Sequence, residues 1–75
     1  MAQSLREKLE AAIRHEMEAQ TRYMAAVQAM VPFDTEGIEP PRDAVAREED
    51  AYAELREAQA AKQSVLDALR RKLGR

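Results

Sequence analysis

The side chains of this sequence that could take part in chemistry are carboxylates and one histidine, because none of its 75 residues is a cysteine. His15 lies next to Glu16 and three residues before Glu18, a grouping that raises the question of a carboxylate metal site. Helical bundles with such sites use a Glu-x-x-His motif, but the residue three positions before His15 is Ala12. We therefore expect no metal site within one chain. A carboxylate metal-binding bundle with ligands from a second subunit stays open as an alternative.

Other catalytic arrangements are missing from the sequence. It has no cysteine nucleophile, no Ser-His-Asp constellation and no glycine-rich phosphate loop, which are the groups that nucleophilic catalysis or nucleotide chemistry would need. We therefore expect the protein not to be an enzyme and to bind no cofactor.

The first element expected is a helix from about residue 5 to residue 31. Ser4 followed by Glu7 matches the S-x-x-E capping box, which places the helix start at Leu5. Pro32 is expected to end the helix, since a proline interrupts helical hydrogen bonding. At roughly 100° per residue, the large apolar residues share one face: Leu5, Leu9, Ile13, Met17, Met24, Val27 and Val31.

A second helix is expected from about residue 42 to residue 73. Residues 32–41 hold all three prolines and one of the two glycines, and are the predicted loop. Asp43 is the expected N-cap and Gly74 the expected stop. Apolar residues of this helix recur in the alternating steps of three and four that are typical of a coiled coil. We interpret them as an interaction seam: Val45, Tyr52, Leu55, Leu66, Leu69 and Leu73.

Polar residues interrupt both apolar patterns near the middle of each helix. Glu16 and Gln20 fall within the apolar arc of the first helix, and Gln59 and Lys62 occupy seam positions of the second. If the chain folds back at the loop, Glu16 lies opposite Gln59, with Lys62 one turn away. We therefore predict a polar layer of these four residues. Such layers fix register at some cost in stability.

Charge is concentrated at the predicted loop end. Residues 34–50 hold seven acidic residues and two arginines, whereas the rest of the chain holds ten basic and seven acidic residues. Acids at the start of the second helix and bases at its end complement the helix dipole. The loop acids are not explained in this way. We identify an acidic tip that could contact a basic partner or a divalent ion: Asp34, Glu36, Glu39 and Asp43.

The segment EPPRDAVAREED at residues 39–50, followed by ELR at 54–56, resembles the descending coiled-coil helix of the DksA/TraR-type regulators. It is more distantly similar to that of the Gre transcript-cleavage factors. Those families insert an acidic-tipped hairpin into the secondary channel of bacterial RNA polymerase. Asp43 matches the second acid of their D-x-x-D-x-A motif, but Pro40 and Val45 replace the first Asp and the Ala. The globular domain and the zinc-site cysteines of DksA have no counterpart here.

Composition limits the remaining possibilities. A charged fraction of 35% with a net charge of −2 argues against direct binding to nucleic acid or to anionic lipid. No apolar run approaches the roughly 20 residues of a membrane span, and the N-terminal segment lacks the layout of a signal peptide. We expect a cytoplasmic protein.

The size of the chain completes the sequence-based expectation. A single domain over residues 1–75 buries only about 60% of its unfolded surface, and without cysteines it has no disulfide to compensate. We therefore expect an all-α antiparallel two-helix hairpin, completed as a four-helix bundle by dimerisation or by a partner. Its expected function is non-enzymatic protein–protein interaction, with itself as a homodimer or with another helical protein. The alternative partner, implied by the resemblance, is RNA polymerase.

Overall fold

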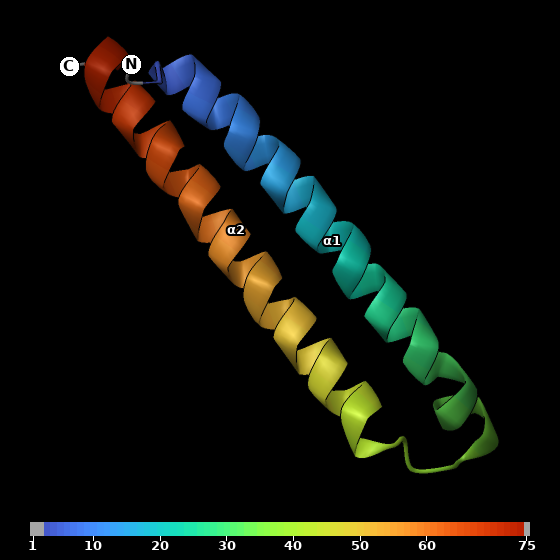
Figure 1. The fold of residues 1–75 in the computed structure, drawn as a ribbon. Helices are drawn as coiled ribbons and strands as arrows, with labels where there is room; N and C mark the ends of the chain where they lie inside the picture. Colours follow the sequence, from blue (N-terminus) through green and yellow to red (C-terminus); the bar gives the residue numbers. More distant parts are fainter. Residues whose placement is uncertain (1–2, 75) are drawn as a thin grey trace.

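The protein consists of two long helices in a computed structural model that describes residues 3–74. Helix α1 spans Leu5–Glu36 and helix α2 spans Arg42–Gly74. The helices run antiparallel along their whole length, with both termini at one end and the loop at the other (Figure 1). The predicted all-α helical hairpin is confirmed.

The hairpin is a rod. The radius of gyration of its Cα atoms is 16.9 Å, and the principal extents are 54 × 25 × 15 Å. A compact chain of this length would have a radius of gyration of about 11 Å. Consequently each helix has one neighbour only, and every side chain outside the single helix–helix interface faces the surroundings.

Helix α1 begins with the predicted capping box. The Ser4 hydroxyl accepts a hydrogen bond from the Glu7 backbone N–H at 3.1 Å. The Glu7 carboxylate in turn accepts one from the Ser4 N–H at 3.0 Å. These two bonds satisfy amide groups that have no partner inside the helix.

The predicted end of α1 at Val31 is wrong, because the helix passes through Pro32 and continues to Glu36. Pro32 removes the hydrogen bond to the carbonyl four residues earlier and crowds that carbonyl, but it does not end the helix. The chain turns instead at Gly37, whose φ is 69°. The N–H of Gly37 donates to the Asp34 carbonyl at 3.1 Å, and the N–H of Ile38 donates to the Phe33 carbonyl at 2.8 Å. This Schellman cap satisfies the last carbonyls of the helix.

The predicted caps of α2 also need correction. The Pro41 carbonyl accepts from the N–H groups of Ala44 and Val45, both at 3.1 Å, so Pro41 and not Asp43 is the N-cap. Asp43 lies inside the first turn, where its charge still complements the helix dipole. At the other end, Gly74 is the last residue of α2 and not the first residue beyond it.

The helix–helix interface is lined by small residues. The buried side chains are Ala19 and Ala26 on α1 and Ala51 and Ala58 on α2, spaced seven residues apart on each helix. No large apolar side chain within residues 3–74 is fully buried. The core of the hairpin is therefore thin, and it contributes little hydrophobic stabilisation.

The predicted apolar face of α1 divides between two sides of the helix. Leu5 and Leu9 are partly buried, whereas Ile13 is 40% and Met17 is 62% exposed. From Ala12 onward the interface contains alanines at intervals of seven, whereas the exposed large apolar residues each lie one position after an interface residue. One position is a rotation of about 100°, which carries these large side chains out of the interface.

Candidate interaction surface

The large apolar side chains that remain exposed on the two helices lie on one side of the hairpin. On each helix, a residue directly after an interface residue points about 100° away from the interface. Because the helices are antiparallel, this rotation leads to the same side of the hairpin on both of them. The exposed fractions along this line are Ile13 40%, Met17 62%, Met24 50%, Val31 52%, Tyr52 44% and Leu73 73%. We call this side the apolar face. It also includes the partly buried Val27, Val45 and Leu66.

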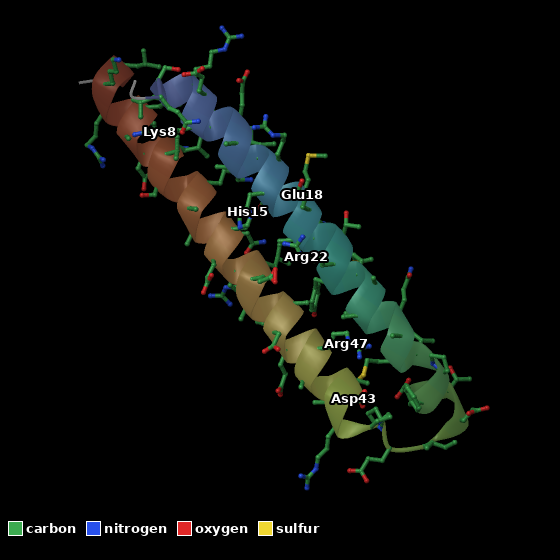
Figure 2. All side chains as sticks on the ribbon, in the orientation of Figure 1. Lys8, His15, Glu18, Arg22, Asp43 and Arg47 are labelled. Carbon is green, nitrogen blue, oxygen red and sulfur yellow. The ribbon has the colours of Figure 1, made fainter. Side chains whose placement is uncertain are left out.

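The opposite side of the hairpin is charged. Lys8, His15, Glu18 and Arg22 follow one another along α1 (Figure 2), and all four are exposed. Arg22 reaches across to α2, where its Nε and one terminal nitrogen lie 3.1 and 2.9 Å from a Glu54 carboxylate oxygen. This pair is about half exposed. The charged side has the character of a solvated surface, in contrast to the apolar face.

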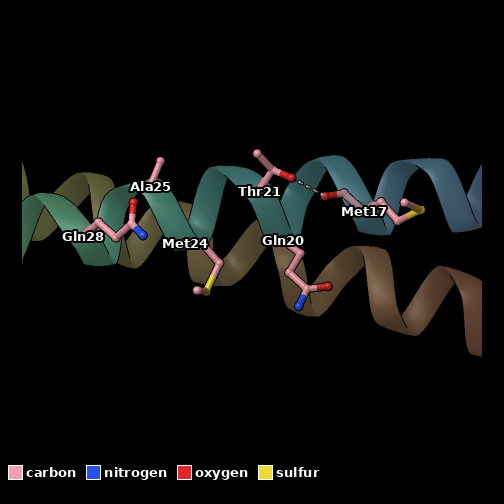
Figure 3. Close-up of a pocket in the computed structure, with 6 residues that line it drawn as sticks. All are labelled: Met17, Gln20, Thr21, Met24, Ala25 and Gln28. Carbon is pink, nitrogen blue, oxygen red and sulfur yellow. Dashed lines mark hydrogen bonds between the residues drawn. The ribbon is translucent and has the colours of Figure 1, made fainter.

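A shallow hollow of about 480 Å³ lies on the outer side of α1, at the edge of the apolar face, and its lining comes from this helix alone. Figure 3 shows Met17, Gln20 and Met24 projecting from the helix, with the Thr21 hydroxyl hydrogen-bonded at 3.0 Å to the Met17 carbonyl. Methionine side chains are flexible and polarisable, and they adapt to the shape of a partner. The hollow therefore suits an apolar protein side chain.

Tyr52 is held in place at the edge of the apolar face. Its ring centroid lies 5.5 Å from that of Tyr23, with the rings inclined at 50°. On its other side, the Arg56 guanidinium donates to the Tyr52 hydroxyl at 3.1 Å and lies 5.8 Å from the ring centroid. Partial burial, reinforced by the negative charge of Glu48, raises the pKa of Tyr23 above its usual value of 10.0. The Tyr23 phenol thus stays neutral at physiological pH.

Of the four residues of the predicted polar layer, the structure brings Glu16 and Lys62 into direct contact. Lys62 Nζ lies 2.6 Å from Glu16 Oε1 in the helix–helix interface, and the two side chains are only 31% and 18% exposed. Gln20 and Gln59 are exposed and occupy positions on the apolar face. Because α1 continues past Pro32, the chain turns later than expected. Glu16 is therefore level with Lys62 rather than with Gln59.

The predicted seam of α2 also divides between the two surfaces. Leu55 and Leu69 occupy positions in the helix–helix interface, where they are partly buried. The other members of the seam belong to the apolar face: Val45, Tyr52, Leu66 and Leu73. The alanines repeated at intervals of seven distinguish the interface positions from the positions on the apolar face. A sequence analysis based on large apolar residues misses this signal.

The acidic tip is spread over the loop end of the rod. Asp34 and Glu36 lie in the last turn of α1, Glu39 lies in the loop and Asp43 lies in the first turn of α2, all exposed. Asp43 pairs with Arg47 at 3.7 Å within the same helix. In the part of the chain that the structure describes, no three potential metal-ligating residues are grouped as an ion site. The resemblance to DksA/TraR-type regulators stays a prediction.

Comparison with protein-family models, with curated proteins and with solved structures finds no match to this chain. Neither helix in residues 3–74 combines the length and the apolar character needed to cross a membrane. Function is therefore inferred from the surfaces of the hairpin itself.

Proposed function

We propose that this protein is a non-enzymatic interaction module that docks its apolar face onto the helices of another polypeptide. The observation that carries the proposal is the one-sided distribution of exposed large apolar residues. Within residues 3–74, Ile38 in the loop is the one such residue that lies off the helices. Scattered apolar residues on a surface need no explanation, but large apolar side chains gathered on one side of a molecule indicate an interaction site.

The thin core supports the same conclusion. Full burial of a Leu, Ile, Met or Val side chain stabilises by about 1.5–3 kcal/mol, but the hairpin fully encloses only alanines. Since the chain has no cysteine, assembly is the available way to bury more apolar surface. Two further helices packed on the apolar face would produce a four-helix bundle, which encloses such side chains on all sides.

Site-specific photo-cross-linking tests this function without destabilising the fold by a charged substitution. A photoreactive benzoylphenylalanine is placed at Met24 on the apolar face, or at Ala61 as a matched control on the opposite side. After irradiation in cells, we expect a covalent protein adduct from position 24 and none from position 61, measured by gel shift and mass spectrometry.

An adduct at position 24 supports the module whether the captured polypeptide is a second copy or a foreign protein, provided that its cross-linked segment is helical and apolar. Equal adducts at both positions, or none at position 24, would contradict the proposal. The first result would indicate non-specific collision and the second an unused surface.

A further inference from the structure

We propose that the occupant of the apolar face is a second copy of this chain, packed antiparallel so that the loop of one hairpin lies beside the termini of the other. This inference rests on the proposed function and adds the identity and the direction of the partner. Three features carry it: the net charges at the two ends of the apolar face, the charges of the two ends of the rod, and the uncharged α1 line at the centre of the face.

The two ends of the apolar face carry opposite charge. Arg6, Glu10 and Arg70 occupy the line of the face near the termini, with a net charge of +1, and Asp34, Arg42 and Glu49 occupy the same line near the loop, with a net charge of −1. All six are exposed. The two arginines near the termini have only long contacts on their own helices, 3.7 Å from Glu10 and 3.7 Å from Asp67, and their side chains are 88% and 75% exposed. Exposed pairs of this kind contribute little, so both arginines can turn to a carboxylate of a partner.

The rod as a whole repeats this polarity. Residues 34–50 at the loop end hold seven acidic residues and two arginines. Residues 3–15 and 62–74 at the other end hold seven basic and three acidic residues. Parallel packing of two copies would bring like ends together, whereas antiparallel packing brings each acidic end beside a basic one. Complementary charge selects orientation and suppresses wrong pairings.

The centre of the face suits contact with itself. On α1, the line from Ile13 to Val31 contains no charge, and its one polar member is Gln20. On α2, the central charge is Arg56, which is already hydrogen-bonded to Tyr52. A two-fold axis across the face would run the α1 line of one copy against the α1 line of the other in the opposite direction, with the methionines near the centre. An isologous contact of this kind buries the same patch on both copies.

The same charges disfavour other occupants. A lipid surface or a nucleic acid carries negative charge along its whole length and would be repelled by the acidic loop end. A second copy matches both ends at once. A stable interface buries about 800 Å² per partner, and a face two helices wide on a rod 54 Å long is large enough for it.

Distance measurement between spin labels tests the partner and the direction together. The chain contains no cysteine, so Thr35→Cys places one label at the loop end and Gln3→Cys one at the terminal end, both at exposed positions. In antiparallel dimers, two Thr35 labels lie near the full 54 Å length of the rod from each other, and so do two Gln3 labels. A mixture of the two labelled proteins gives an additional short distance, comparable with the 15–25 Å cross-section. Circular dichroism confirms that the labelled variants remain helical.

The other outcomes overturn the inference and do so separately from the proposed function. Short distances between identical labels would show a parallel dimer and exclude the antiparallel arrangement. A chain that sediments as a monomer at every concentration would exclude the second copy. In that case, a position-24 adduct with a foreign protein would still support the proposed interaction module. The absence of any such adduct would contradict both the dimer and the interaction module.

Discussion

Glu16 and Lys62 form the one ion pair within residues 3–74 that is largely withdrawn from solvent, at 2.6 Å across the helix–helix interface. It interrupts an interface made mainly of alanine and leucine. If one helix slid by a turn, both charges would lose their partner while still partly buried, which is costly. We therefore interpret the pair as the group that fixes the register of the hairpin, as polar residues at seam positions do in coiled coils.

We predict that Glu16→Ala lowers the free energy of unfolding by about 1–2 kcal/mol, between the values for exposed ion pairs and for hydrogen bonds to buried charges. The matched control is Glu54→Ala, which removes the half-exposed pair with Arg22 and should cost less than about 1 kcal/mol. Urea unfolding at a fixed protein concentration, followed by circular dichroism, measures both. Equal losses in the two variants would show that burial does not strengthen the interface pair.

At the scale of the elements, the end of α1 depends on one backbone conformation. Gly37 has a φ of 69°, in the left-handed region that other residues enter only with strain. A Cβ at this position would meet no atom within 4 Å, so the cost of a side chain there is a backbone cost alone. The end of α1 is therefore set at this residue.

Gly37→Ala should destabilise the protein by about 1–2 kcal/mol, the usual penalty of the left-handed conformation. Gly37→Asn should cost less, since asparagine tolerates that conformation better. Gly74→Ala is the control, because Gly74 lies within α2 and a Cβ there also meets open space. Thermal unfolding followed by circular dichroism checks the order. A Gly37→Ala variant as stable as wild type would mean that the loop can close without the Schellman cap.

At the scale of the whole molecule, the hairpin is a rod with a charged side, an apolar side and ends of opposite charge. This arrangement separates the two contributions to assembly. The apolar face supplies non-directional attraction along the rod. The charged ends distinguish one direction of packing from the other, through interactions that salt screens beyond about 8–10 Å.

We predict that antiparallel self-association weakens as salt is added. If each end of the dimer contributes about 0.5 kcal/mol, as a typical exposed ion pair does, the dissociation constant should rise about fivefold between low and high salt. Sedimentation at a series of chloride concentrations measures it, with Asp34→Asn and Glu49→Gln together as the variant that should lose the dependence. A dissociation constant that falls with salt would mean that the like-charge contacts of a parallel dimer were being screened.

The sequence by itself determined the elements. The start of α1, the position of the loop and the all-α class follow from interactions between residues at most five apart, such as the Ser4–Glu7 capping box. A pattern of residue types captures these interactions directly. The end of α1 and the caps of α2 were exceptions. The proline favoured a stop at Val31, whereas the glycine cap at Gly37 defined the stop that the structure shows.

Only the tertiary structure decided which side of each helix faces the other. Two lines of residues run side by side on the helices. One holds the repeated alanines and most of the leucines, and the other holds Ile13, the exposed methionines and most of the valines. Hydrophobicity favours the larger side chains as the core. The hairpin instead pairs the lines that contain Ala19, Ala26, Ala51 and Ala58, since small residues let two helices approach closely. The larger side chains, and with them the candidate site, are thereby left exposed on the apolar face.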